Sequence, residues 1–201
     1  MRETSKLRRL GPGRGLGEAE VVRHLAMVKL LTIDVDGVLT DGGLYYADDG
    51  RIQRKYNVKD GVGIKRVLAA GVEVAIVSAG VSASVPERAR TLGVEHVFTG
   101  AEDKLAVVAK LAEDLGIGLE ATAHIGDDLN DVPLMEAVGL AITVADAEPA
   151  AWAAAKVITE RRGGEGAVRE ICDLLVKAHG GDGGADSGST EKSGGSRAGG
   201  R

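Results

Sequence analysis

Segments that favour β-strands alternate with segments that favour α-helices along most of this chain of 201 residues. A short amphipathic helix is predicted at 17–26. The predicted strands lie at 28–33, 72–77, 94–98, 121–126 and 140–144, and further helices at 82–92, 102–115, 131–138, 147–155 and 165–178. Such alternation is typical of a parallel sheet that is covered by helices on both faces. The sequence therefore predicts an α/β fold with three layers, as in Rossmann-like proteins.

The chain length suggests one domain, predicted at 17–179, with a tail at each end. Residues 1–16 form a basic extension rich in Gly, with a net charge of +4 over residues 1–15. Residues 180–201 hold nine Gly and four Ser, a composition that cannot offset the entropy of ordering, so we expect disorder there. Alternatively, Met27 is the true start and everything before it is an extension.

The segment 42–58 interrupts the alternation and predicts a β-hairpin. Asp49-Gly50 is a strong signal for a tight turn, and apolar and aromatic residues flank it on both sides. All three tyrosines of the chain, Tyr45, Tyr46 and Tyr56, fall in this segment. Tyrosine is enriched at protein interfaces, so the hairpin either contacts another copy of the chain or packs on its own domain.

Two carboxylates, Asp34 and Asp36, and the hydroxyl of Thr40 follow the first predicted strand in the sequence IDVDGVLTDG. Residues i and i+2 of an extended strand point to the same side, and a buried carboxylate without a partner is costly. Ligands bind at the carboxyl ends of strands in open α/β sheets. The pair therefore indicates a site for a cation or for hydrogen-bond donors, although Asp and Gly also favour turns.

Polar residues also mark the ends of two other predicted strands and the start of a helix. Ser78 follows the second strand, Lys104 lies near the start of a helix, and Asp127, Asp128 and Asp131 follow the fourth strand. Because the carboxyl ends of parallel strands meet at one edge of the sheet, we expect several of these side chains to converge with those behind the first strand.

The expected cluster suits phosphate chemistry. Oxygen ligands from Asp34, Asp36 and Asp127 suit Mg²⁺, which commonly bridges to phosphate. Ser78 and Lys104 would hold a phosphoryl group. An aspartate can attack such a group and form an aspartyl-phosphate, while a second carboxylate serves as acid and base. Neither a P-loop nor a GxGxxG motif follows the first strand, so these nucleotide-binding devices are not indicated.

Composition narrows the class of protein. The net charge is −5, and since the N-terminal tail is basic and residues 180–201 are neutral, the body carries about −9, which argues against nucleic-acid binding. Cys172 is the only cysteine and is expected in the core, as in a reducing cytoplasm. We expect neither a signal peptide nor a membrane span, because no apolar run is long enough.

The same residues carry a resemblance to a known family. The segment DVDGVLTDG, Ser78, Lys104 and the segment GDDLND resemble the four motifs of the haloacid dehalogenase superfamily of phosphatases. The segments KLLTIDVDGVLTDGGLYY and GGEGAVREICDLL resemble its capless branch, and the likeness covers about residues 20–178. The resemblance implies a haloacid dehalogenase fold in which the hairpin at 42–58 replaces a cap domain and helps to build a homotetramer.

The resemblance also implies roles for the main site residues. Asp34 is the nucleophile and a Mg²⁺ ligand. Asp36 is the general acid/base and binds the metal through its backbone carbonyl. Asp127 is the third protein ligand of Mg²⁺, and Ser78 and Lys104 hold the phosphoryl group.

Supporting roles follow in the same way. Asp128 and Asp131 belong to the acidic motif that orients the metal shell. Thr40 is a further candidate for phosphate binding. Arg169, together with glycines of the segment 163–166, could reach the substrate of a neighbouring subunit.

The implied activity is hydrolysis of a phosphorylated sugar acid, foremost 3-deoxy-D-manno-octulosonate 8-phosphate in lipopolysaccharide precursor synthesis. The family usually has Thr-Gly-Arg where this chain has Ser78-Ala79-Gly80, so a guanidinium that could bind a sugar-acid carboxylate is absent at this point of the sequence. Acylneuraminate 9-phosphate or another sugar phosphate is the alternative substrate.

Two rival functions belong to other classes. One is a non-catalytic module for tetramer assembly, like that of some acylneuraminate cytidylyltransferases, although a scaffold need not keep the complete set of acidic, hydroxyl and lysine residues. The other is a phosphotransferase, which would have to exclude water from an aspartyl-phosphate without a cap domain.

Overall fold

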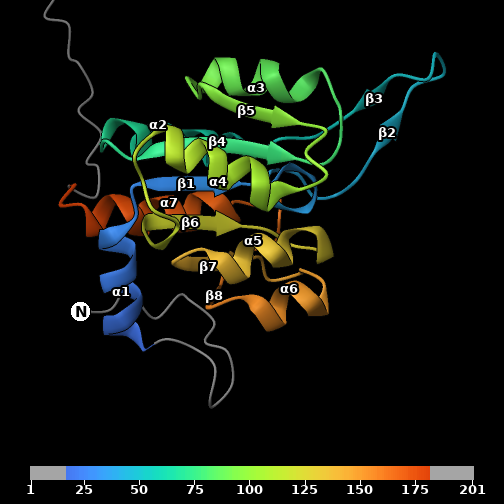
Figure 1. Ribbon diagram of the computed structural model, residues 1–201. Helices are drawn as coiled ribbons and strands as arrows, with labels where there is room; N and C mark the ends of the chain where they lie inside the picture. The colour runs from blue at the N-terminus through green and yellow to red at the C-terminus, as the bar shows by residue number, and fades with distance from the viewer. Residues whose placement is uncertain (1–16, 182–201) are drawn as a thin grey trace, which may run out of the picture.

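A computed structural model describes residues 17–181 as three layers, a parallel sheet between two layers of helices (Figure 1). The predictions for 1–16 and for nearly all of 180–201 lie outside the described residues. The sheet has six strands in the order β5-β4-β1-β6-β7-β8. They are β1 (Leu30–Ile33), β4 (Glu73–Ser78), β5 (His96–Thr99), β6 (Thr122–Ile125), β7 (Leu140–Thr143) and β8 (Val157–Ile158). The predicted α/β fold with parallel strands is confirmed.

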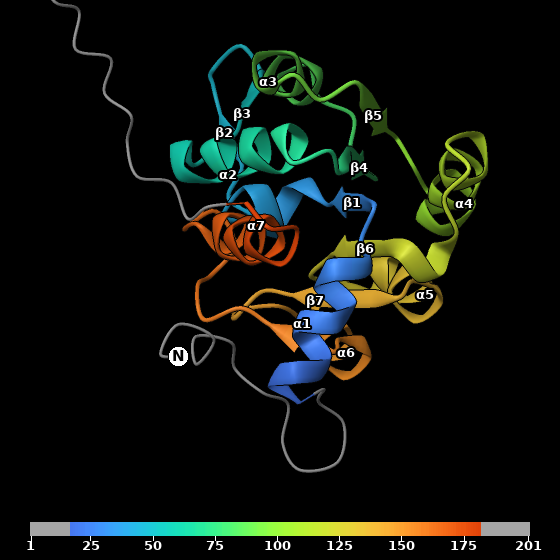
Figure 2. The same ribbon diagram turned by 90° about the vertical axis from the view of Figure 1, so that its left-hand side faces the viewer.

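Helices cover both faces of the sheet, as the end-on view shows (Figure 2). One face carries α1 (Glu18–Met27), α2 (Val58–Ala69), α3 (Ser84–Leu92) and α7 (Ala167–Ala178), and the other carries α4 (Lys104–Asp114), α5 (Val132–Ala137) and α6 (Pro149–Ala154). Short helical turns lie at Val35–Leu39, Leu119–Ala121 and Leu129–Asp131. Within the described residues, no helix has both the length and the apolar character needed to cross a membrane.

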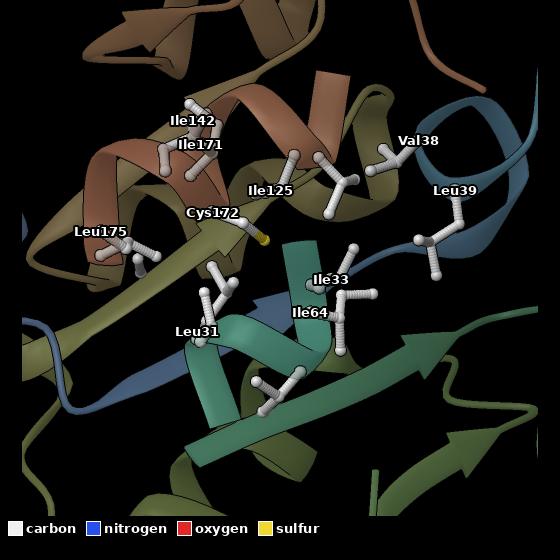
Figure 3. Packing of buried hydrophobic residues seen from close by; sticks show 14 of the residues in the cluster. Leu31, Ile33, Val38, Leu39, Ile64, Ile125, Ile142, Ile171, Cys172 and Leu175 are labelled. Atoms are coloured by element: carbon white, nitrogen blue, oxygen red, sulfur yellow. The ribbon is translucent and has the colours of Figure 1, made fainter. Parts of the chain in front are cut away.

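Alternate residues of the strands belong to two hydrophobic cores, one on each face of the sheet. Leu31 and Ile33 of β1 pack towards α2 and α7 (Figure 3), whereas Leu30 packs on the opposite face with residues of α4 and α5. This is the period of two that an extended strand requires. Cys172 of α7 is fully buried in the first core, which confirms the prediction that it is a core residue.

Helix α2 and strand β8 were not predicted from the sequence. Gly61 and Gly63 lower the helical signal of α2, since glycine is a poor helix former. A Cβ atom at Gly63 would lie 2.9 Å from Cβ of Cys172 and 3.2 Å from Cα of Arg169. The two glycines therefore allow α2 to pack closely on its neighbours, which offsets their low propensity.

The chain reverses its direction across the sheet at β1. It runs outward from β1 to β4 and β5, and then returns through α4 to β6 on the other side of β1. Such a reversal creates a ligand-binding crevice at the carboxyl ends of the two central strands. Asp34 comes directly after the end of β1, and Asp127 lies two residues beyond the end of β6.

The predicted hairpin is present as β2 (Tyr45–Tyr46) and β3 (Ile52–Gln53), and it projects from the body beyond the carboxyl ends of the strands (Figure 1). Tyr45 and Tyr46 are 53% and 69% exposed. The hydroxyl of Tyr56, in contrast, lies 3.1 Å from Oγ of Ser84 in the same domain. One tyrosine therefore packs on its own domain, and the other two remain exposed.

We predict that Gly63→Val destabilises the domain by about 1–3 kcal/mol, the usual cost of overpacking a dense core. The added atoms would meet the backbone and Cβ atoms of α7, which cannot move freely. Val62→Ala in the same helix is the control, because Val62 is exposed and its truncation should change the free energy of unfolding by less than about 0.5 kcal/mol. Urea unfolding followed by circular dichroism measures both, and equal stability of the two variants would contradict the packing argument.

Candidate active site

The loop that follows β1 lies directly against the loop that follows β6. Gly37 has a φ of 85°, which favours glycine, and a Cβ atom at this position would lie 2.0 Å from Oδ2 of Asp127. Any side chain here would require the carboxylate of Asp127 to move. The predicted convergence of the acids behind the first and fourth predicted strands is therefore present in the structure.

Thr40 stabilises the first loop from inside. Its side chain is fully buried, and Oγ1 accepts hydrogen bonds from the backbone N–H of Gly37 at 3.4 Å and of Gly42 at 3.2 Å. The expectation that Thr40 helps to bind phosphate finds no support in these contacts. The observed role of the hydroxyl is to close the turn, and phosphate binding by Thr40 stays a prediction.

The glycines of segment 163–166 support the same loop of their own chain. The N–H of Gly164 donates to the carbonyl of Val38 at 2.9 Å, and a Cβ atom at Gly163 would lie 1.7 Å from the carbonyl oxygen of Gly37. Their observed role is thus to let two backbones approach closely. Contact with the substrate of a neighbouring subunit stays a prediction.

Lys104, the first residue of α4, bridges two carboxylates in the interior. Its Nζ donates to Oδ1 of Asp34 at 2.8 Å and to Oδ1 of Asp131 at 2.6 Å, and the side chain is only 1% exposed. Burial alone would lower the pKa of Lys104, but the charges of Asp34 and Asp131 outweigh burial and raise it. A permanent positive charge therefore lies beside Asp34.

The acidic groups around this ammonium are strongly perturbed. Burial raises the pKa of Asp34 to about 6, with the charge of Asp131 adding to the effect. Burial and the charges of Asp34 and Asp131 raise the pKa of Asp127 to about 8. Burial would also raise the pKa of Asp131, but the hydrogen bond from His124 and the charges of His124 and Lys104 hold it well below its ordinary value. Three carboxylates lie around one buried ammonium, so ionising all of them would leave excess negative charge, which a bound cation would neutralise.

A divalent cation fits this group of acids. Asp34, Asp127 and Asp131 each offer an oxygen, and the three atoms lie within 4.8 Å of one another. Oxygen ligands of this type suit Mg²⁺. Both oxygens of Asp131 already accept hydrogen bonds, Oδ1 from Lys104 and Oδ2 from the backbone N–H of Asp127 and Asp128. Asp34 and Asp127 are therefore the carboxylates best placed to bind the ion.

Ser78 ends β4 beside β1, as expected, and is buried. Its Oγ accepts a hydrogen bond from the N–H of Gly80 at 3.2 Å. A Cβ atom at Gly80 would lie 3.4 Å from Oδ2 of Asp36 and 3.6 Å from Oγ of Ser78. The Ser78-Ala79-Gly80 turn thus lies against Asp36.

Arg54 from the hairpin reaches the same place. Its Nε and Nη2 donate to the two oxygens of Asp36 at 2.6 and 3.0 Å, a bidentate arrangement that is strong and directional. Nη2 also lies 3.5 Å from the position of a Cβ atom at Gly80. A guanidinium is therefore present beside the turn where the resemblance expects one, although it comes from another part of the sequence.

Two predicted residues lie away from the cluster. Asp128 is exposed, and its side chain accepts from the N–H of Leu129 at 2.6 Å, as a cap of the short helical turn. Arg169 donates from Nε to both oxygens of Asp173 at 2.8 Å, and its backbone N–H donates to Asp60. Neither side chain forms a hydrogen bond or an ion pair with Asp34, Asp36 or Asp127, although the charge of Asp128 helps to raise the pKa of Asp127.

Sequence reasoning missed Arg54 and His124. Arg54 is one of several charged residues in the hairpin, and nothing in its spacing relates it to Asp36. His124 is fully buried in β6 and lies 2.9 Å from Asp131. A histidine within a short buried strand was the one available signal, and such a signal is weak.

Comparisons with known proteins agree with this geometry. The family model of haloacid dehalogenase-like hydrolases matches residues 94–171. The chain is 44% identical over 162 residues to the 3-deoxy-D-manno-octulosonate 8-phosphate phosphatase of Escherichia coli strain K12, which covers 81% of this chain and 86% of the relative.

Solved structures of similar proteins share the fold. The phosphatase of the same name from Moraxella catarrhalis, in complex with magnesium, phosphate and the sugar acid KDO, has a TM-score of 0.78 and 38% identity, over 79% of this chain and 91% of that one. The cobalt-bound deoxy-D-mannose-octulosonate 8-phosphate phosphatase of Haemophilus influenzae has a TM-score of 0.75 and 37% identity, over 78% and 92%.

We predict that the metal-free protein loses stability as the pH rises from about 5.5 to 8.5. The folded-state pKa of Asp127, about 8, exceeds its unfolded value of 3.8, so the folded state holds a proton that the unfolded state releases, and stability falls as pH rises through this window. Asp127→Asn should flatten the slope. With chelator present, Tm is compared at pH 5.5 and pH 8.5 for both proteins. The decrease in Tm should be larger for the wild type than for the variant by at least about 2–4 °C, the shift that corresponds to 1 kcal/mol.

Adding Mg²⁺ should raise the wild-type Tm more at pH 8.5 than at pH 5.5, because a cation favours ionised carboxylates. Thermal scans at the two pH values provide the measurement. Equal pH slopes in the wild type and in Asp127→Asn would show that Asp127 does not carry the effect.

Proposed function

The chain belongs to the family of haloacid dehalogenase-like hydrolases, and we propose that it removes phosphate from 3-deoxy-D-manno-octulosonate 8-phosphate with the help of Mg²⁺. One observation carries the proposal. Asp34 pairs with the buried ammonium of Lys104, and the loop that follows Asp34 contacts a second carboxylate, that of Asp127. This arrangement offers a nucleophile, a positive charge for the phosphoryl group and two ligands for a metal ion.

In the proposed reaction, Asp34 attacks the phosphorus atom. Lys104 holds Oδ1 of Asp34, so Oδ2 is the oxygen proposed to attack. As the bond between Asp34 and phosphorus forms, the bond between phosphorus and the sugar oxygen breaks, and Asp36 gives a proton to the departing oxygen. The product of this step is the free sugar acid together with an aspartyl-phosphate.

Water completes the cycle. Asp36, now ionised, takes a proton from a water molecule, and the water oxygen attacks phosphorus while the bond to Asp34 breaks. Inorganic phosphate leaves, and both carboxyl groups return to their starting states. To act in these steps Asp36 must release at least one of its two hydrogen bonds with Arg54, so the hairpin would influence the reaction directly.

Mg²⁺ would be held by the carboxylates of Asp34 and Asp127 and by the backbone carbonyl of Asp36. When bound, it would neutralise charge on the phosphoryl oxygens and on the clustered acids. Lys104 and Ser78 would bind other phosphoryl oxygens, since both are placed at the same edge of the sheet as Asp34.

We further propose a homotetramer in the cytoplasm. Support comes from the exposed apolar residues of the hairpin, Leu44, Tyr45, Tyr46 and Ile52, which form a surface of the kind that interfaces use. Arg169 and the segment 163–166 would then contribute near a subunit boundary. The oligomeric state can be measured by sedimentation equilibrium.

Acylneuraminate 9-phosphate is the second candidate substrate, because Gly80 replaces the arginine that the family usually has. Phosphate release should be measured from both sugar phosphates and from an aryl phosphate, with Mg²⁺ and with chelator. Release from the octulosonate ester alone would support the proposal. Release from another ester alone would change the substrate, and no release from any would favour the role of an assembly module.

We predict that Asp34→Asn lowers turnover by at least about 10³-fold, since loss of a nucleophile removes the covalent route. Asp49→Asn in the exposed hairpin turn is the matched control and should keep activity within about twofold. Both variants should be folded at the assay temperature, which circular dichroism checks. Near-normal phosphate release by Asp34→Asn would exclude Asp34 as the nucleophile.

We predict that Arg54→Ala lowers kcat/KM by about 10- to 100-fold, because the hydrogen bond that Arg54 can keep while Asp36 reacts positions the acid/base carboxylate, and a hydrogen bond to a charged group is worth about 1.5–3 kcal/mol. Arg51→Ala is the control from the same hairpin, because Arg51 pairs with Asp49 in solvent and such pairs contribute little. Steady-state kinetics on the preferred ester tests both. If the two variants behave alike, Arg54 has no special role at Asp36.

A further inference from the structure

A chain of buried polar side chains extends from the middle of the sheet to the candidate active site. Thr32 of β1 and His124 of β6 are direct partners across the parallel pair of strands, and Oγ1 of Thr32 lies 2.8 Å from Nδ1 of His124. The other ring nitrogen, Nε2, lies 2.9 Å from Oδ1 of Asp131. All three side chains are fully buried. Buried polar groups are costly unless they are bonded, so the chain of contacts needs each of its members.

Asp131 is the link between His124 and the catalytic group. Its Oδ1 faces both His124 and Lys104, and its Oδ2 accepts from the backbone N–H of Asp127 at 3.1 Å and of Asp128 at 3.3 Å. A carboxylate offers about four acceptor directions, and here four donors are available to them. Asp131 is therefore held in one orientation, with one oxygen for the side chains and one for the backbone.

His124 is the donor that makes this orientation unique. Since Asp131 is ionised, Nε2 must carry the proton in the contact with Oδ1. Without the donor from His124, Oδ1 of Asp131 would accept a hydrogen bond only from Lys104. One buried acceptor position would then have no partner. The ammonium of Lys104 is shared between Asp131 and Asp34, so a change in Asp131 moves the charge that lies beside Asp34.

We propose that His124 is a positioning residue for the phosphoryl group: it fixes Asp131, which fixes Lys104 on Asp34, while Thr32 orients the imidazole ring. This inference rests on the proposed phosphatase function. His124 forms no hydrogen bond with Asp34 or Lys104, so it acts through Asp131. The alternative is a purely structural role, in which the hydrogen bonds of this core histidine only stabilise the fold.

Two substitutions separate these roles. In His124→Gln the amide nitrogen can take the place of Nε2 and donate to Asp131. In His124→Asn the amide reaches only the place of Nδ1, next to Thr32. Both replace a buried ring by a smaller amide, so both should lower Tm, whereas only His124→Asn removes the donor to Asp131. Thr32→Val removes the contact with the ring on the other side and leaves Nε2 in place.

The first measurement is the binding of inorganic phosphate to the Mg²⁺-loaded variants by calorimetry, which needs no knowledge of the substrate. His124→Asn should weaken phosphate binding by about 10-fold or more, the effect of one charged hydrogen bond transmitted to Lys104, whereas His124→Gln should stay within about threefold of the wild type. Thr32→Val should lie between them. The same order should hold for kcat with an aryl phosphate.

Equal phosphate binding by His124→Asn and His124→Gln, at a temperature where both are folded, would overturn the inference and leave a structural role. If the wild type binds phosphate and cleaves the aryl phosphate but not the octulosonate ester, the proposed substrate is wrong, and the comparison of the variants still tests His124. Absence of phosphate binding by the wild type would overturn both proposals.

Discussion

The buried ammonium of Lys104 is the interaction on which the rest of the site depends. Without it, Asp34 would be a buried carboxylate with no ammonium beside it and Asp131 would lose one of its four donors, and removing one partner of a buried ion pair is strongly destabilising. The fold supplies the lysine through its topology. Helix α4 is the crossover that returns the chain from β5 to β6, so its first residue reaches the edge of the sheet where β1 and β6 end. The ammonium of Lys104 thus links helix α4 to the segments that follow β1 and β6.

Close contact between backbones is the second constraint. Gly163 lies against the backbone of Gly37, and Gly37 leaves room for the carboxylate of Asp127, so three loops from distant parts of the sequence pack closely because these two glycines carry no side chains. Such packing leaves little freedom to the loop after β1. The carboxylate of Asp34 and the backbone around Asp36 are held rigid before any ligand binds, which is the kind of preorganisation that electrostatic catalysis requires.

The sequence predicted the features that follow from local pattern and topology. Alternating segments indicated the parallel sheet, and because parallel strands end at one edge, the convergence of Asp34, Asp127 and Lys104 followed. What it missed depends on tertiary contacts. Helix α2 has glycines whose low propensity is offset only by packing, and His124 acquires its partners only through the pairing of β1 with β6. A sequence also does not reveal the direction of a hydroxyl, and in the structure Oγ1 of Thr40 accepts from two backbone N–H groups of its own loop.

The hairpin links the outside of the molecule to its reactive centre. A two-stranded hairpin alone is marginally stable in water. At its base, Arg54 anchors it to Asp36 with two hydrogen bonds, and Lys55 pairs with Asp41 at 2.5 Å. At its outer part, Tyr45 and Tyr46 have much of their surface exposed. A second subunit that covered these tyrosines would hold the hairpin in place and, through Arg54, would also fix the carboxylate of Asp36. Assembly and catalysis would then be coupled by one short segment.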